Sequence, residues 1–140
     1  MDPKESFDKT RSLLKEHHEW MKETVNLIAS ENLPSPAVRE AMTTDFGNRY
    51  AEGQPGKRVY AGCKYIDEVE FLAMDLAKEV YGGVHANVQP VSGAMADLAT
   101  YTATTDPGDT MMCLPISCGG HISMGKKKFG GTAGAVHGLN

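Results

Sequence analysis

Two tyrosines and a glutamate stand close together in a glycine-rich stretch, RYAEGQPGKRVYAGC, at residues 49–63. The side chains of Tyr50, Glu52 and Tyr60 can form hydrogen bonds to a ligand, and a glutamate can also take up or release a proton. The glycines and Pro55 make a regular helix or strand unfavourable here. The residues alone favour a surface loop with solvated charges, and the alternative is a loop that carries polar side chains to a ligand.

A second candidate site lies in QPVSGAMAD, where a short predicted strand gives way to a predicted helix. Backbone N–H groups at a helix N-terminus lack partners, and the helix dipole adds positive potential there. Gly93 lets an anion approach the backbone and Ser92 can donate a hydroxyl, so the turn is suited to a phosphate group. A plain helix cap at Ser92 is the alternative, and a motif this short favours it.

His121 follows two glycines in SCGGHISMG, just after a second predicted strand. Ligands in open α/β sheets bind beyond the carboxyl ends of the strands, which would place His121 on the same rim as Ser92. Its imidazole can stack on a flat ring or carry a proton, although the residues alone favour a structural histidine bonded to a loop carbonyl. Cys118 and His121 have C-x-x-H spacing, with Cys113 and His137 nearby. A closed zinc site needs four ligands in a tight pattern, so no metal is predicted.

Hydrophobic periodicity predicts the helices that position these residues. An amphipathic helix is expected over residues 4–25, and a second helix over residues 65–81 ends at a glycine pair. Pro36 favours a short helix over residues 36–43, because proline fits the first turn of a helix.

Short apolar runs at residues 85–91 and 110–116 are predicted strands, and between them lie a helix that begins at Ser92 and a turn at residues 105–109. This strand–helix–strand order predicts an α/β fold with a parallel-containing sheet. A parallel sheet needs both faces covered, and with so few strands it would be incomplete. The glycine-rich residues 125–140 show no closing element, so we expect the N-terminal part of a larger protein.

Composition fits one soluble globular domain, since the 140 residues (15.1 kDa) are 41% hydrophobic and 23% charged. A net charge of −4 gives no basic field for nucleic acid, and no apolar run approaches the roughly 20 residues that span a bilayer. Three cysteines without disulfide-framework spacing, and opening residues without the apolar core of a secretory signal, predict a cytoplasmic protein.

Five segments follow one another along the chain: NLIASEN, RYAEGQPGKRVYAGC, ANVQPVSG, PGDTMM and GGHISMG. Their order and spacing resemble those of serine hydroxymethyltransferases, archaeal ones in particular, from about residue 20 to residue 140. The resemblance implies pyridoxal 5′-phosphate as cofactor and a fold type I (aspartate aminotransferase-like) architecture. Residues 65–140 would begin the large cofactor-binding domain, and residues 1–64 would hold an N-terminal helix and an interface and active-site loop.

The resemblance also implies roles for the candidate residues. Ser30, in NLIASEN, would help to hold the carboxylate of the amino-acid substrate. Ser92, Gly93 and Ala94 would hold the cofactor phosphate, as the helix-start argument also proposes. His121 would lie against the pyridine ring and help to orient the substrate.

Three residues of the glycine-rich stretch would act in the active site of a neighbouring subunit. Tyr50 would touch the cofactor phosphate, and Tyr60 would lie near the substrate and the cofactor-binding lysine. Glu52 would lie beside the serine hydroxyl and the pterin, where it manages a proton. The resemblance therefore implies a homodimer with shared active sites, and it gives the stretch a reason to avoid regular structure.

Four positions depart from the common pattern of the family. Ala94 replaces a hydroxyl residue, Val59 replaces an aromatic one, and Cys118 and Met124 stand where many members have histidine. Most of these changes would lie toward the pterin, so we hypothesise that the reduced pterin that accepts the one-carbon unit is a modified form such as tetrahydromethanopterin, with tetrahydrofolate as the alternative. The lysines at 126–128 could attract an acidic pterin tail, although a solvated charge run is favoured.

The implied reaction is the reversible transfer of the serine hydroxymethyl group to a reduced pterin, which leaves glycine. The family's cofactor-binding lysine, its aspartate beside the pyridine nitrogen and its substrate-binding arginine lie further along than these residues reach, so this chain alone is expected to be inactive. The alternatives are another fold type I pyridoxal-phosphate enzyme, a non-catalytic module that pairs with a longer subunit, and a standalone phosphate-binding domain.

Overall fold

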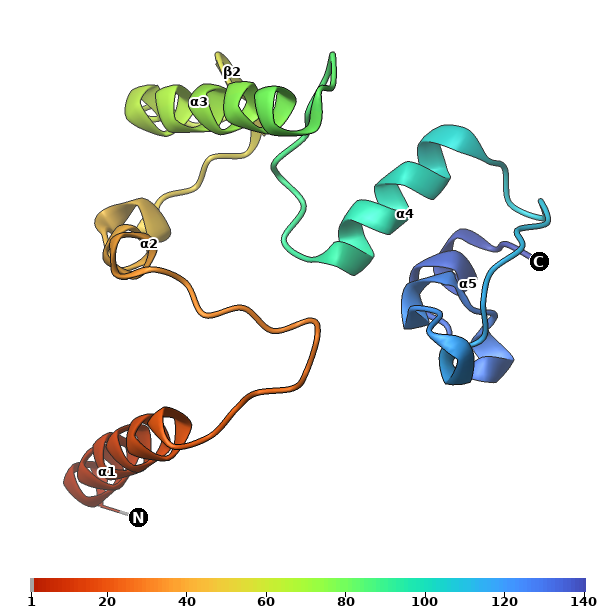
Figure 1. Ribbon diagram of the computed structural model, residues 1–140. Helices are drawn as coiled ribbons and strands as arrows, with labels where there is room; N and C mark the ends of the chain where they lie inside the picture. Colours follow the sequence, from red (N-terminus) through yellow and green to blue (C-terminus); the bar gives the residue numbers. More distant parts are fainter. Residues whose placement is uncertain (1) are drawn as a thin grey trace. The chain divides into compact units, whose positions relative to one another are not determined.

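The computed structural model describes residues 2–140, with the backbone alone at residue 129. The chain forms two compact units, Met1–Arg49 and Tyr50–Asn140, and each is described by itself (Figure 1). Helices are the main elements of both units. Within the described residues, none of these helices combines the length and the apolar character that crossing a membrane requires.

The first unit holds two α-helices whose starts are set by local caps. α1 spans Pro3–Lys22 and is capped by the Asp2 carboxylate, and α2 spans Pro36–Met42 and is capped by the Ser35 hydroxyl. A proline opens each helix, where its missing N–H costs nothing. A short 3₁₀ helix, η1, follows at Asp45–Asn48. Both predicted helices are confirmed, and α1 ends three residues earlier than expected.

The second unit opens with a small antiparallel hairpin, in which β1 (Gly53–Gln54) pairs with β2 (Lys57–Arg58). Its turn places Pro55 before Gly56, whose φ of +76° suits the third position of a type II turn. Gly53 also has a positive φ, and a Cβ there would lie 2.7 Å from the Lys57 carbonyl oxygen. The stretch predicted to avoid regular structure is therefore irregular apart from these two short strands.

A long helix, α3, follows at Lys64–Tyr81 and confirms the helix predicted over residues 65–81. It ends at Gly82, whose left-handed φ of +65° is the usual way for glycine to stop a helix. The hairpin lies along this helix, as Figure 1 shows by the position of β2 beside α3. This pairing builds the scaffold for the tyrosines discussed below.

The remainder of the second unit is a helix with a set of short turns packed against it. α4 spans Gly93–Thr104 and begins at the predicted cap, Ser92. Three 3₁₀ helices and one α-helix follow: η2 at Ile116–Cys118, η3 at Ile122–Met124, η4 at Lys127–Phe129 and α5 at Ala133–His137. α4 contacts both α5 and η3 (Figure 1). The expectation of no closing element in residues 125–140 is wrong, because α5 forms there.

The predicted strands at 85–91 and 110–116 do not form, and the structure contains no parallel sheet within residues 2–140. The segment that leads into the run at 110–116 lies beside residues 138–140. The Gly108 N–H donates to the Gly138 carbonyl at 2.9 Å, and the Met111 N–H donates to the Asn140 carbonyl at 3.0 Å. An extended segment becomes a strand only when a neighbouring strand pairs with it. Two parallel strands joined by a single helix would also leave the faces of their sheet uncovered. The parallel-containing sheet of the fold-class prediction is therefore unconfirmed for these residues.

Candidate active site

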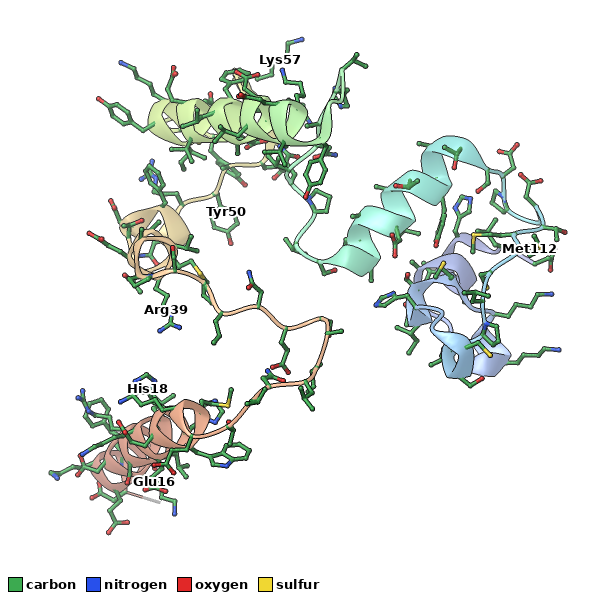
Figure 2. All side chains as sticks on the ribbon, in the orientation of Figure 1. Glu16, His18, Arg39, Tyr50, Lys57 and Met112 are labelled. Carbon is green, nitrogen blue, oxygen red and sulfur yellow. The ribbon has the colours of Figure 1, made fainter. Side chains whose placement is uncertain are left out.

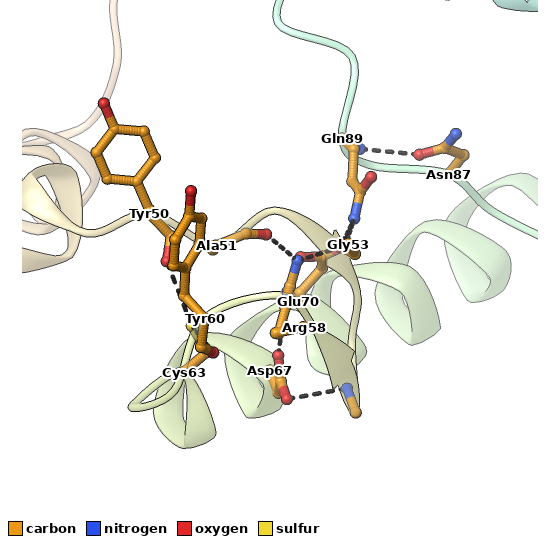
Figure 3. A network of polar contacts seen from close by, with 11 residues as sticks. Tyr50, Ala51, Gly53, Arg58, Tyr60, Cys63, Asp67, Glu70, Asn87 and Gln89 are labelled. Atoms are coloured by element: carbon orange, nitrogen blue, oxygen red, sulfur yellow. Dashed lines mark hydrogen bonds and ion pairs between the residues drawn. The ribbon is translucent and has the colours of Figure 1, made fainter.

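Arg58 ties the glycine-rich stretch to α3 (Figure 3). Its side chain is only 4% exposed, and its Nε donates to the Asp67 carboxylate at 2.7 Å while its Nη2 bonds the Glu70 carboxylate. Its Nη1 donates to the Ala51 carbonyl at 2.6 Å and to the Gly53 carbonyl at 2.5 Å. We call these residues the Arg58 clamp, because one guanidinium joins the hairpin to two acids on the helix.

Further hydrogen bonds extend the Arg58 clamp. The Gly56 N–H donates to Asp67 at 2.9 Å, and the Gln89 side-chain amide donates to the Gly53 carbonyl at 3.1 Å and to Glu70 at 2.6 Å. The bonds to Glu70 and then Asp67 raise the pKa of Arg58. The bond from Arg58, followed by that from Gly56, lowers the pKa of the Asp67 carboxyl. Both groups therefore remain charged near neutral pH.

The Arg58 clamp presents the two tyrosines side by side. The ring centroids of Tyr50 and Tyr60 are 5.6 Å apart with an angle of 53° between the rings, and Figure 3 shows both rings at the same end of the hairpin. The buried thiol of Cys63 lies beneath them, 3.4 Å from the Tyr50 carbonyl. Tyr50 is 78% exposed (Figure 2), and the Glu52 side chain is also exposed. All three predicted side chains thus stand on a braced loop and remain accessible.

The start of α4 has the features of an anion site. The Ser92 hydroxyl oxygen accepts from the Met95 N–H at 3.2 Å, which leaves the hydroxyl proton available to a ligand. Ser92 and Gly93 are exposed, and a Cβ added at Gly93 would meet no atom within 4 Å. Ala94 is half-buried and can offer its backbone N–H. The cap predicted at Ser92 is present, and the same turn is open to an anion.

His121 belongs to a chain of polar side chains that also reaches α4. Its Nδ1 lies 2.8 Å from the hydroxyl of Ser123, and that hydroxyl donates to the carboxylate of Asp97. The Nε2 of His121 has no hydrogen-bond partner among the described residues, and the side chain is exposed. The contact with a loop carbonyl that the sequence favoured for His121 belongs to His137, whose Nε2 lies 3.1 Å from the Thr105 carbonyl.

A cavity of about 530 Å³ lies beside His121. It is lined chiefly by apolar residues of the segment 111–117, and Met124 and Lys126 also line it. Within the described part of the chain, no group of three or more histidine, cysteine or acidic side chains is placed to hold a metal.

Ser30 lies in the first unit, in a turn at residues 29–30 where the Glu31 N–H donates to the Ile28 carbonyl at 3.1 Å. Its side chain is exposed. The structure therefore brings together Tyr50 with Tyr60, and Ser92 with Gly93 and Ala94, whereas Ser30 stands in a separate unit.

Sequence reasoning missed the residues that support these side chains. Asp67 and Glu70 are three residues apart and therefore lie on one face of α3. An arginine in the glycine-rich stretch just before such an acidic pair is a signal that could have indicated the Arg58 clamp. Ser123 and Asp97 gave no signal, because they are 26 residues apart and meet only when η3 packs against α4.

The family model described as serine hydroxymethyltransferase matches residues 4–134. The chain therefore belongs to the serine hydroxymethyltransferase family, whose members have the fold type I architecture of pyridoxal-phosphate enzymes. The resemblance noted in the sequence is confirmed.

Curated relatives with this name come from several archaea. The chain is 61% identical over 136 residues to the protein of Nitrosopumilus maritimus, which covers 97% of this chain and 31% of that relative. It is 56% identical over 146 residues to the protein of Korarchaeum cryptofilum, and this match covers all of this chain and 34% of that relative. It is 61% identical over 110 residues to the protein of Methanopyrus kandleri, and this match covers 79% of this chain and 26% of that relative. The chain thus spans about a third of the length of the relatives it matches.

Proposed function

We propose that this chain is the amino-terminal third of a cytoplasmic, pyridoxal-phosphate-dependent serine hydroxymethyltransferase. The enzyme would transfer the hydroxymethyl group of serine to a reduced pterin and release glycine. The observation that carries the proposal is the family match over residues 4–134, together with relatives of that name at 56–61% identity. The accessible tyrosines and the open start of α4 agree with it.

The start of α4 fits the cofactor phosphate. Ser92 has a free hydroxyl proton, Gly93 leaves the backbone open to approach, and the first N–H groups of a 12-residue helix point outward. Ala94 would contribute its N–H in place of a hydroxyl. Bound pyridoxal phosphate would supply the electron sink for the charge left when the Cα–Cβ bond of serine breaks.

The remaining residues would bind and orient the substrate. His121, with its exposed imidazole, would lie against the cofactor ring, and Ser30 would hold the substrate carboxylate. Tyr50, Glu52 and Tyr60 would act in the partner subunit's active site of a homodimer. A braced loop with accessible side chain ends suits that task, because the interactions that fix the loop leave these ends free for another chain.

The pterin would be tetrahydrofolate or tetrahydromethanopterin. Val59 is 65% exposed beside Tyr60, and it would offer the pterin an aliphatic surface in place of an aromatic ring. Turnover with the two pterins, compared in the full-length protein, identifies the acceptor. A clear preference for tetrahydrofolate would contradict the modified-pterin expectation.

Replacing Ser92 by alanine in the full-length protein tests the cofactor site. The S92A variant should bind pyridoxal phosphate about 10- to 100-fold more weakly, because a hydrogen bond to a charged group is lost. Cofactor absorbance during titration measures this. The matched control is S35A, which removes the equivalent cap of α2, and it should leave the affinity unchanged. Wild-type affinity in S92A would contradict the assignment.

The residues 1–140 by themselves should show no serine cleavage above that of free cofactor, since the catalytic lysine of the family is expected beyond them. A non-catalytic module that pairs with a longer subunit is the second candidate, and the accessible Tyr50 and Tyr60 on the braced loop are the observation that favours it. The intact mass of the native protein separates the two. A mass several-fold above 15.1 kDa supports the enzyme, and 15.1 kDa supports the module.

A further inference from the structure

The chain from Asp97 through Ser123 to His121 joins two segments that the sequence gives no reason to connect. Ser123 is 0% exposed and lies in η3, which packs against α4, the helix that carries Asp97. A buried hydroxyl between a carboxylate and an imidazole must share one proton between two neighbours. How that proton is placed decides which nitrogen of His121 carries hydrogen.

Two arrangements compete at His121. In one arrangement the Ser123 hydroxyl donates its single proton to Asp97, and the Ser123 oxygen accepts from Nδ1–H, 2.8 Å away. In the other arrangement Nδ1 carries no hydrogen and accepts from the Ser123 backbone N–H, 3.2 Å away. These contacts exclude each other, because one nitrogen of a neutral imidazole either donates or accepts.

The first arrangement is favoured by distance, because an Nδ1 without hydrogen would face a lone pair of the Ser123 oxygen at 2.8 Å, whereas the competing Ser123 backbone N–H lies at 3.2 Å. Hydrogen bonds to an ionised acceptor are roughly twice as strong as neutral ones, which keeps the Ser123 proton on the side of Asp97. Tyr101, on the same helix, also interacts with the Ser123 hydroxyl. Burial and then the nearby Asp97 charge raise the pKa of its phenol, so Tyr101 stays neutral and can donate to a second lone pair of the Ser123 oxygen without taking the Ser123 proton.

We propose that Asp97, acting through Ser123, holds His121 in the tautomer with hydrogen on Nδ1 and a lone pair on Nε2. Asp97 and Ser123 are then positioning residues. The exposed Nε2 becomes a hydrogen-bond acceptor for an O–H or N–H group of whatever lies against the ring. That this partner is the bound cofactor or amino acid rests on the proposed function, whereas the tautomer itself does not.

Nitrogen NMR of the full-length protein, labelled with ¹⁵N-histidine and free of cofactor, reads the tautomer directly. The H121Q variant identifies the His121 signals by their loss. The wild type should carry hydrogen on Nδ1 of His121. In D97A the freed Ser123 hydroxyl should donate to Nδ1 and move the hydrogen to Nε2, a change of roughly tenfold in the tautomer ratio.

Ser123 variants and an internal reference complete the experiment. S123A should also move the hydrogen to Nε2, because the backbone N–H then donates to Nδ1, and S123T should restore the wild-type tautomer. His137 is the internal reference, since its contact with the Thr105 carbonyl requires hydrogen on Nε2 in every variant. D75A, which removes an exposed carboxylate on α3, is the matched control and should change neither histidine.

Hydrogen on Nε2 of His121 in the wild type, or an unchanged tautomer in a folded D97A, would overturn the inference. The tautomer measured in D97A decides between these outcomes even if S123A does not fold. Cofactor titration of the same samples separates the two proposals. A tautomer that responds to D97A in a protein without affinity for pyridoxal phosphate supports the inference and rejects the proposed function. Normal cofactor affinity with an unresponsive tautomer rejects the inference alone.

Discussion

At the scale of single residues, Arg58 and Asp67 form the most constrained pair of the second unit. The guanidinium donates to two carboxylates and two backbone carbonyls, and Asp67 accepts from Arg58 and from the Gly56 N–H. Lysine has no planar fork and could not reach these four acceptors at once. The pair therefore fixes the path of the backbone that presents Tyr50 and Tyr60.

The lowered pKa of Asp67 predicts how this local structure responds to acid. A carboxyl whose pKa is lower in the folded state stabilises that state above its unfolded pKa, near 4, and the stabilisation is lost as pH falls through the folded pKa. Hydrogen exchange of the Gly56 amide should therefore show a protection factor that is constant from pH 8 to about 5 and falls below about 4.

The D67N variant is the control for this response. Asparagine cannot titrate, so its Gly56 protection should be lower at neutral pH and should lose the step below about pH 4. A wild-type protection factor that instead decreases between pH 7 and pH 5 would show that another group controls the turn.

At the scale of elements, the hairpin β1–β2 and α3 act as one rigid support. R58K should loosen the hairpin from the helix and reduce serine cleavage by the full-length protein roughly 100-fold, because small displacements of positioned groups have effects of that size. The matched control is K57R, since Lys57 is the exposed neighbour on the same strand (Figure 2) and, among the residues that the structure describes, makes no bond to α3. Equal activity of R58K and K57R would contradict this role.

The helices were predictable because their signals are local. Ser35, Ser92 and Gly82 each mark a helix end through bonds or dihedral angles within a few residues. The strands at 85–91 and 110–116 were predicted wrongly, since an apolar extended run becomes a strand only with a paired neighbour that local patterns do not supply.

The candidate site divides in the same way. The type and spacing of Tyr50, Tyr60 and Ser92 are local features of the sequence, and they indicate the chemistry of these residues directly. Their supports, such as Ser123 beneath His121, come from contacts between distant segments and have no local pattern. The assigned roles, and the division of the chain at residue 64, stay predictions.

At the scale of the whole chain, apolar side chains are far more exposed than a folded domain allows. Of the described hydrophobic residues, Cys63, Ala133 and Leu139 are buried, whereas Leu27 is 87% exposed and Met112, labelled in Figure 2, is 97% exposed. A cooperative fold needs a contiguous apolar core. Each of the two units, taken by itself, therefore lacks most of the burial that stabilises a folded domain.

Isolated residues 1–140 should accordingly unfold without a sharp transition and should bind a hydrophobic dye, while the full-length protein unfolds cooperatively. Calorimetry of both samples measures this, with helix content followed by circular dichroism. α1, α3 and α4 should remain partly helical in the isolated chain, because their caps and periodicity are local. A cooperative heat-absorption peak from residues 1–140 alone would mean that the exposed apolar faces cover one another, for example between two copies of the chain, and that these residues form a complete folding unit.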